Sequence, residues 1–420
     1  MNIKYSKVEK NWCFLNLKND NGRTEKKMNN KLVLAYSGGL DTSYCVKSLS
    51  EAGYEVHAVS VNTGGFNNDE ILALESKALT LGAKSYTSIE ALETFYHDIV
   101  KYLIFGNVLK NSTYPLSVSA ERVTQAVEIV EHAKKIGATS IAHGSTGAGN
   151  DQVRFDLIFQ TLAPQIEIIT PIRDQKLSRE DEIVYLKKHG VDWSWEKAQY
   201  SINKGLWGTS VGGSETLKSR EPLPSSAYPS DCIKTTAEKI SLHFDKGELV
   251  GVNNTTLSPV EAIQQLQVLA SAFAIGRDIH VGDTIIGIKG RVGFEAAASL
   301  VSIKAHHLLE KHTLSKWQLH HKDYIGSYYG MMLHEGQYLD PVMRDFEALL
   351  SSSQQTVTGT VFVTLHPYRF TLDGIESEFD LMDNSFGTYG EANEAWTADE
   401  AKGFIKLSAN AGKIYQHVNK

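Results

Sequence analysis

Two patterns of apolar and polar positions alternate in the first half of the chain. A continuous apolar run at 32–35 is typical of a strand that is covered on both faces, and the mostly apolar run at 56–61 predicts a second buried strand. Between and after these runs, apolar positions recur at helical spacing. The expected helices cover residues 42–52, 69–81, 91–105 and 121–136. A third short strand is expected at 140–143. This alternation predicts a parallel sheet with helices on both faces, in which ligands bind beyond the carboxyl ends of the strands.

After about residue 195 the pattern changes. The stretch 205–230 is rich in glycine, serine and proline, has little periodicity and is expected to be loop. A hairpin is expected over 240–252, because two strand-like runs flank the turn Asp245-Lys-Gly247. Ser258 and Thr397 each precede a glutamate by three residues, which predicts a capped helix start at both places. Further strands are expected at 284–288, 356–365 and 368–372.

The change of hydrophobic pattern near residue 195 predicts the fold class and the domains. We expect an α/β chain in which a parallel-sheet domain at 31–195 precedes a mixed α+β domain at 196–390. A short C-terminal helical tail is expected at 391–420. Residues 1–30 are polar, contain a turn cluster at 19–22 and are expected to form an N-terminal extension. Met28 lies three residues before the first strand and is an alternative start of translation.

The first strand runs into the motif Ser37-Gly-Gly-Leu-Asp-Thr-Ser43, which opens a helix. Its two glycines permit tight turns and close approach of a ligand to the backbone. The free N–H groups of the helix start, together with the helix dipole, form an anion site, to which the motif adds three hydroxyl groups. Because no lysine stands at the helix start, this is not the common Gly-x-x-x-x-Gly-Lys-Ser/Thr loop. The motif predicts binding of a polyphosphate.

A second glycine-rich motif, Ala142-His-Gly-Ser-Thr-Gly-Ala-Gly-Asn-Asp-Gln-Val-Arg-Phe155, follows the third strand. Thr146, Asn150, Asp151 and Arg154 offer donors, acceptors and both signs of charge. Arg154 lies one helical turn after Asn150, on the same face. Such a loop suits an amino acid, whose amine and carboxylates need opposite partners. An ordinary helix start with an aspartate in its first turn is an equal alternative for this motif alone.

Composition excludes several classes of protein. The 420 residues carry a net charge of −7, which argues against a nucleic-acid partner. Cys13, Cys45 and Cys232 lie too far apart for a disulfide framework or a zinc cluster. No apolar run reaches the roughly 20 residues of a membrane span. The histidines at 306, 307, 320 and 321 lack cysteine or acidic partners at ligand spacing, so no protein-bound metal is expected there. A cytoplasmic enzyme is the expected class.

Together the two motifs resemble those of the argininosuccinate synthase family, and the resemblance runs from about Lys31 to the C-terminus. It is dense over 31–160 and looser at Gly276-Arg-Asp278, Ile286-Gly-Ile-Lys289 and Gly403-Phe-Ile-Lys406. The first motif is similar to the pyrophosphate loop of ATP pyrophosphatases, and the resemblance implies that fold for the first domain and a synthetase domain after it. It also implies an AMP-forming ligase of arginine biosynthesis that joins citrulline and aspartate through a citrullyl-adenylate. A homotetramer, with the segment around 395–420 reaching a neighbouring subunit, is implied as well.

The resemblance also implies roles for single residues. ATP, with Mg²⁺, is expected to bind Ala35, Tyr36, Ser37, Gly38, Gly39, Leu40, Asp41, Thr42, Ser43, Val61 and Gly144. Aspartate is expected to bind Thr146, Asn150 and Asp151. Citrulline is expected to bind Tyr114, Ser119, Asn150, Arg154, Ser201, Ser210, Gly282 and Phe294. Asp41 and Asp151 are the expected catalytic residues. Asp41 would lie beside the triphosphate and help to hold Mg²⁺, with a helix-dipole partner as the alternative.

Three positions depart from the family. Ala148 stands where the family loop usually carries a lysine, and Gly282 and Phe294 stand where it uses a glutamate and a tyrosine for citrulline. Without that carboxylate, the α-ammonium of citrulline lacks its partner. Either Asp283 substitutes from the next position, or the acceptor is an Nα-acylated (acetyl or succinyl) citrulline. A tRNA-modifying ATP pyrophosphatase and a non-catalytic relative are further alternatives; the acidic net charge and the two intact motifs argue against them.

Overall fold

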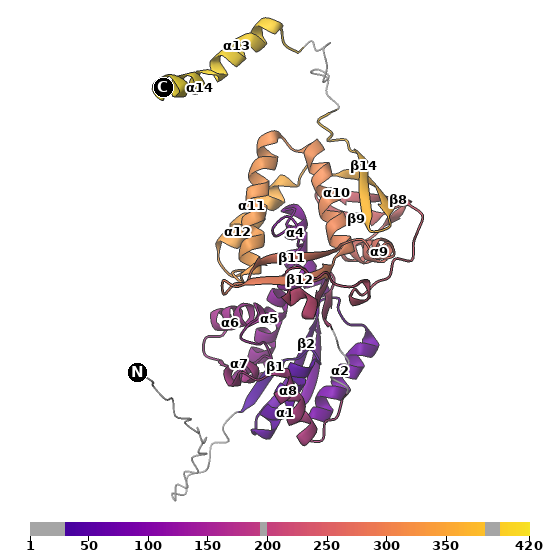
Figure 1. Cartoon of the computed structure of the whole chain (residues 1–420), viewed down its shortest axis with the longest axis vertical. Coiled ribbons are helices and arrows are strands. Elements are labelled where there is room, and N and C mark those ends of the chain that lie inside the picture. Colours follow the sequence, from indigo (N-terminus) through magenta and orange to yellow (C-terminus); the bar gives the residue numbers. More distant parts are fainter. Residues whose placement is uncertain (1–29, 194–199, 383–394) are drawn as a thin grey trace, which may run out of the picture.

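The computed structural model describes residues 30–193, 200–382 and 395–420 (Figure 1). The expected N-terminal extension with its alternative start at Met28 lies outside the described residues. The expected domain boundaries near 195 and 390 lie outside them as well.

The first part of the chain forms a five-stranded sheet in which every pair of neighbours is parallel. The strands are β1 (Lys31–Ala35), β2 (Glu55–Asn62), β3 (Ser85–Glu90), β4 (Ser140–Ala142) and β5 (Glu167–Ile169), in the order β3-β2-β1-β4-β5. Leu32 and Leu34 of β1 point into one apolar core and Val33 into another, so both faces of the sheet are covered. The predicted α/β class is confirmed. The short edge strand β5 and the partly buried edge strand β3 were not predicted, because neither has a continuous apolar run.

Helices cover this sheet. They are α1 (Leu40–Glu51), α2 (Asn68–Leu81), α5 (Ser117–Ile136), α6 (Asp151–Leu162), α7 (Pro171–Gln175) and α8 (Arg179–Lys188). The helix expected at 91–105 is divided into α3 (Leu92–Phe95) and α4 (Lys101–Phe105) by a π-helical turn, Tyr96–Val100. The helix expected at 121–136 begins four residues earlier, at Ser117.

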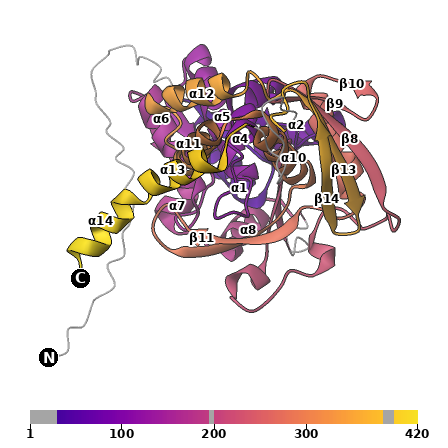
Figure 2. The same cartoon turned by 90° about the horizontal axis from the view of Figure 1, so that it is seen from above.

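A second five-stranded sheet has only antiparallel pairs. It comprises β8 (Glu238–Asp245), β9 (Glu248–Val252), β10 (Thr255–Thr256), β13 (Gly359–His366) and β14 (Arg369–Glu376). Its helices are α9 (Pro259–Ser271), α10 (Ala297–Thr313), α11 (Lys316–His334) and α12 (Val342–Ser353). Helix α10 packs against β13 and β14, with α11 and α12 on its other side (Figure 2). The hairpin and the capping box expected around 240–261 are confirmed.

A third, four-stranded sheet lies between these two parts (Figure 1). It consists of β6 (Ser201–Gly205), β7 (Gly208–Gly212), β11 (Arg277–Asp283) and β12 (Lys289–Glu295), in the order β11-β12-β7-β6. Two sequence predictions are wrong here. The stretch 205–230 begins with strand β7 rather than loop, and 284–288 is the turn between β11 and β12 rather than a strand. In that turn Gly287 has φ +87° and the Thr284 amide donates to the Ile288 carbonyl at 2.7 Å.

The chain ends in α13 (Ala398–Ser408) and α14 (Asn410–Val418), which lie apart from the rest of the protein (Figure 1). Thr397 accepts from the Glu400 amide, as its capping box predicts. No residue of either helix is buried. Among the described residues, no helix is both long and apolar enough to cross a membrane.

Candidate active site

A cavity of about 1000 Å³ lies between the parallel sheet and the four-stranded sheet. It opens beyond the carboxyl ends of β1 and β4, which are neighbours in the sheet. The chain leaves β1 toward β2 on one side, and β4 pairs with β5 on the other, so the strand order reverses at this point. Crevices at such a reversal are the usual ligand sites of open parallel sheets. Both glycine-rich motifs contribute to the lining of this cavity.

The loop between β1 and α1 is held in a conformation that favours glycine. Gly38 has φ +74°, and a Cβ at this position would overlap with Leu74 of α2. Lys77 of α2 donates to the Gly38 carbonyl. Gly39 is the N-cap residue of α1 and gives no side-chain cap, so the first-turn amides keep their capacity to bind an anion. Ser37 and Thr42 place two hydroxyl groups beside them, 3.3 Å apart.

Substitution of Gly38 by alanine tests this loop. We expect the free energy of unfolding to fall by at least ~1–2 kcal/mol, because a side chain at positive φ is strained and here also meets Leu74. We expect the KM for ATP to rise at least tenfold. Gly39→Ala is the control for stability, since Gly39 has φ −70° and its added Cβ meets only Ser37 Oγ, at 3.5 Å. Urea unfolding and initial rates measure both effects; a Gly38→Ala protein as stable as Gly39→Ala would contradict the strain.

Asp41, in the first turn of α1, has an acidic neighbour. Glu182 of α8 is only 2% exposed, and its Oε2 has no hydrogen-bond partner among the described residues. Burial and the nearby Asp41 carboxylate raise the pKa of Glu182 to about 8. Two carboxyl groups, one with an orphaned buried oxygen, form a donor set that a divalent cation bound to phosphates would satisfy.

The loop after β4 lies against the loop between β1 and α1, which is expected to bind phosphates. A Cβ at Gly144 would lie 3.2 Å from Asp41 Cβ, so the two motifs are in near contact. The loop is fixed by a partly buried chain of polar contacts. His143 Nδ1 accepts from the Ser145 amide at 3.1 Å, and His143 Nε2 lies 2.9 Å from Asp156, which Arg173 reaches at 2.7 Å. This bracing holds the backbone of the glycine-rich loop in place beside the nucleotide site.

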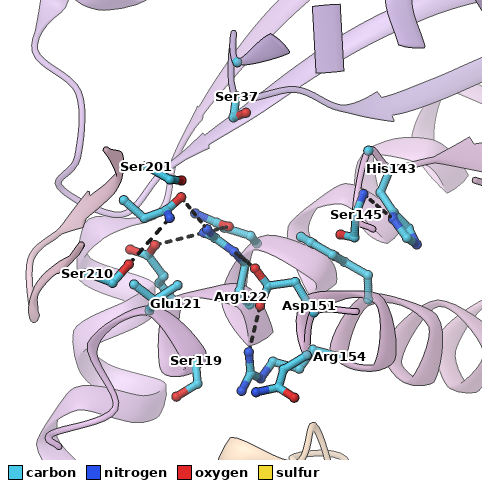
Figure 3. Close-up of a pocket in the computed structure, with 18 of the residues that line it drawn as sticks. Ser37, Ser119, Glu121, Arg122, His143, Ser145, Asp151, Arg154, Ser201 and Ser210 are labelled. Atoms are coloured by element: carbon cyan, nitrogen blue, oxygen red, sulfur yellow. Dashed lines mark hydrogen bonds and ion pairs between the residues drawn. The ribbon is translucent and has the colours of Figure 1, made fainter. Parts of the chain in front are cut away.

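Arg122 of α5 is the centre of the polar network in the cavity (Figure 3). Its guanidinium donates to Asp151 Oδ2 at 3.0 Å, to Glu121 Oε1 at 2.9 Å and to Asn203 Oδ1 at 2.9 Å. Arg154 donates to the second oxygen of Asp151 at 2.7 Å. Although burial acts in the opposite direction, these two arginines hold the pKa of Asp151 below its usual value. Asp151 therefore stays ionised between two cations.

The residues expected to bind citrulline come together on the other side of this network. Tyr114 is buried, its ring stacks on His280 at 5.2 Å, and its hydroxyl accepts from the Val118 amide at 3.1 Å. Ser201 of β6 and Ser210 of β7 lie on neighbouring strands beside Glu121 and Arg122 (Figure 3). Asn150 accepts from the Ile285 amide at 2.8 Å, which joins the second motif to the four-stranded sheet.

Known proteins match this chain over almost its whole length. The family model described as the argininosuccinate synthase N-terminal HUP domain matches residues 31–192, and the model of the C-terminal domain matches residues 200–415. The chain belongs to the argininosuccinate synthase family. Argininosuccinate synthase of Methanocaldococcus jannaschii is 35% identical over 389 residues, 91% of this chain and 97% of that protein. The Xylella fastidiosa protein of the same name is 35% identical, covering 93% and 98%, and a Dehalococcoides mccartyi protein of that name is 37% identical, covering 92% and 96%.

Most of the site residues implied by the argininosuccinate synthase resemblance line the one cavity. They are Ala35, Tyr36, Ser37, Gly39, Leu40, Asp41, Thr42, Val61, Tyr114, Ser119, Gly144, Thr146, Asn150, Asp151, Arg154, Ser201, Ser210 and Gly282. Gly38, Ser43 and Phe294 are not among the lining residues. Phe294 is fully buried, with its ring 5.3 Å from that of Tyr114. Glu121, Arg122 and Asn203 line the cavity but were missed. A glutamate at a helix start usually reflects only the helix dipole, and no motif distinguishes Arg122 or Asn203 in the sequence.

Gly282 stands where the argininosuccinate synthase family uses a glutamate. A side chain at this position would require neighbouring atoms to move. A Cβ at Gly282 would lie 2.7 Å from His280 Nε2. Its neighbour Asp283 pairs with Lys289 at 2.7 Å, and 63% of the Asp283 side chain is exposed. The carboxylate that was one alternative partner for citrulline is therefore largely exposed and already has a cationic partner in Lys289.

Proposed function

We propose that this protein joins citrulline to aspartate with cleavage of ATP to AMP and pyrophosphate, as a step of arginine biosynthesis. The observation that carries this proposal is the single cavity in which a polyphosphate loop meets the ionised Asp151 and its two arginines. Family membership supports the same reaction. The reaction requires that the substrates be held in line and that developing charge be stabilised. Fixed backbone amides and buried charges provide both.

In the first half-reaction, the ureido oxygen of citrulline attacks the α-phosphorus of ATP and pyrophosphate leaves. The amides at the start of α1 and the hydroxyl groups of Ser37 and Thr42 would bind the departing phosphates. We infer that Asp41, with Glu182 behind it, holds the Mg²⁺ of the nucleotide. Bound there, the cation would neutralise the negative charge that develops on pyrophosphate.

In the second half-reaction, the amine of aspartate attacks the activated ureido carbon and AMP leaves. Thr146, Asn150 and Asp151 line the part of the cavity next to the nucleotide loop and would hold aspartate there. Asp151, kept ionised by Arg122 and Arg154, would orient the ammonium before the amine loses its proton. Arg154 would bind the α-carboxylate of citrulline at the other side of the same aspartate.

Measurement of pyrophosphate release with omitted substrates tests this function. We expect release over many turnovers only when ATP, citrulline and aspartate are all present, with AMP and argininosuccinate formed in equal amounts; without aspartate, release stops at one pyrophosphate per active site. Release that does not depend on citrulline, or that depends on added tRNA, would contradict it.

We also propose that α13 and α14 pack against other copies of the chain in a homotetramer. Both helices expose apolar side chains: Phe404, Ile405, Leu407, Ile414, Tyr415 and Val418. Exposed apolar surface of this kind marks a contact site. Light scattering should give four times the chain mass for the full protein and a smaller assembly for a chain that ends at residue 382. An unchanged assembly would contradict this role of the tail.

A cytoplasmic location is part of the proposal, and the unpaired, buried Cys45 is consistent with a reducing compartment.

A further inference from the structure

The proposed acceptor carries an α-ammonium group, and the cavity must provide a carboxylate for it. Five carboxylates are among the described lining residues: Asp41, Glu70, Glu121, Asp151 and Asp283. Asp41 lies in the phosphate loop. Glu70 accepts from the Asn67 amide at 2.8 Å in the capping box of α2. Asp151 is shared by two arginines, and Asp283 is largely exposed and paired with Lys289. This leaves Glu121.

Glu121 lies on α5, two residues after Ser119, and is only 2% exposed. Thr63, in the segment after β2, donates to Glu121 Oε2 at 3.1 Å. A Cβ at position 205 would overlap with that same Oε2, so the glycine at the end of β6 provides the space that the carboxylate fills. The carboxylate is thus fixed in one place by the helix, the segment after β2 and the hairpin.

The Glu121 carboxylate lies beside Ser201 and Ser210, the two serines of the β6–β7 hairpin that are expected to bind citrulline (Figure 3). Ser201, Asn203 and Gly205 alternate along β6, so they share one face of the sheet, and Ser210 pairs with Asn203 on that face. Figure 3 shows Glu121 between Ser210 and Arg122, with Ser201 on the same side of the cavity. Asn203 donates to Ser210 Oγ at 3.5 Å and accepts from Arg122, which ties these groups together.

The charge of Glu121 is only partly compensated in the protein without substrates. Its cationic partner among the described residues, Arg122, is shared with Asp151. Burial, with a smaller effect of Asp151, raises the pKa of Glu121 to about 7 in spite of Arg122 and the Thr63 hydroxyl. A second cation beside the carboxylate would stabilise its charged form.

We propose that Glu121 binds the α-ammonium of citrulline, taking the role that a carboxylate at position 282 has in the family, and so selects free citrulline over Nα-acylated forms. This inference rests on the proposed ligase function. An amide at the same nitrogen has no positive charge and would leave the buried carboxylate without its second partner.

Comparison of citrulline with 5-ureidopentanoate, which is citrulline without its α-amine, tests this role. We expect the wild-type kcat/KM to favour citrulline at least 100-fold. In Glu121→Gln the preference should fall below tenfold through a higher KM for citrulline, while the KM for ATP changes less than threefold. Glu128→Gln is a matched control on the same helix, because Glu128 is not a lining residue of the cavity. Asp283→Asn tests the rival carboxylate, and both of these variants should keep the wild-type preference.

Three results would overturn the proposal. The first is a Glu121→Gln enzyme that loses the same factor on both substrates, since that would indicate a structural role only. The second is loss of the preference in Asp283→Asn instead. The third is a wild-type enzyme with a higher kcat/KM for Nα-acetylcitrulline than for citrulline. Failure of the ligase function itself would be seen separately, as a wild-type protein that releases no pyrophosphate with citrulline and aspartate.

Discussion

Replacement of Arg122 by alanine is expected to abolish ligation and to lower the free energy of unfolding by about 3–5 kcal/mol. The guanidinium donates to Asp151, Glu121, Gln125 and Asn203 in a partly buried site, where the Glu121 side chain is 3% exposed. Its removal leaves two carboxylates in low-dielectric surroundings with one cation, Arg154, that reaches only Asp151. A buried charge without its partner costs far more than the intact pair contributes.

Arg122→Lys separates the two roles of this residue. Lysine keeps the positive charge but has no planar guanidinium group to span four acceptors. We expect most of the stability to be retained, whereas kcat/KM for aspartate falls by a factor on the order of 100, because Asp151 loses its fixed orientation. Lys218→Ala is the control, since Lys218 and its partner Glu221 are both exposed; its loss should leave the free energy of unfolding almost unchanged. A fully active Arg122→Lys enzyme would contradict this role of the planar guanidinium group.

The second large effect is a change in how the free energy of unfolding depends on pH when Glu121 is replaced by glutamine. In the unfolded chain this glutamate has its usual pKa of 4.5, and in the folded protein burial raises its pKa to about 7. Between these pH values the folded state holds a proton that the unfolded state has lost, so the wild-type protein becomes less stable as pH rises. The difference in pKa corresponds to a loss on the order of 3 kcal/mol above pH 7. Glutamine does not titrate and avoids this loss.

We therefore expect Glu121→Gln to match the wild type near pH 4.5 and to be more stable by up to ~3 kcal/mol at pH 8. Urea unfolding without substrates, at several pH values, measures the difference. An acid retained for binding at the expense of stability is typical of active sites. A variant that is less stable than the wild type at pH 8 would indicate that Glu121 is a structural partner of Arg122.

Much of the nucleotide half of the site was predictable from local sequence. Strand β1 has a continuous apolar run, and the glycines and hydroxyl residues that follow it have a direct physical meaning at a helix start. The second motif follows β4, and parallel strands end at the same edge of the sheet, so the two loops were expected to meet. The near contact of Gly144 and Asp41 bears out that reasoning.

The citrulline half was less predictable, because it depends on contacts between segments far apart in the chain. The β6–β7 hairpin contains Gly205, Gly208 and Gly212, which resemble a loop in the sequence. Two of these glycines are required by tertiary packing: Gly205 makes room for Glu121, and Gly208, at φ +129°, abuts Ala296. The charge of Glu121 also has no local signal, since Thr63, which donates to it, and Gly205, which makes room for it, lie 58 and 84 positions away.

The central claim is that the ureido oxygen of citrulline attacks the α-phosphorus of ATP in this cavity. Citrulline labelled with ¹⁸O in its ureido group tests this claim most directly, by mass spectrometry of the AMP formed with ATP and aspartate. The account predicts one ¹⁸O atom in each AMP, because the oxygen that attacks phosphorus leaves with AMP when the aspartate amine displaces it. Unlabelled AMP formed together with argininosuccinate would contradict it.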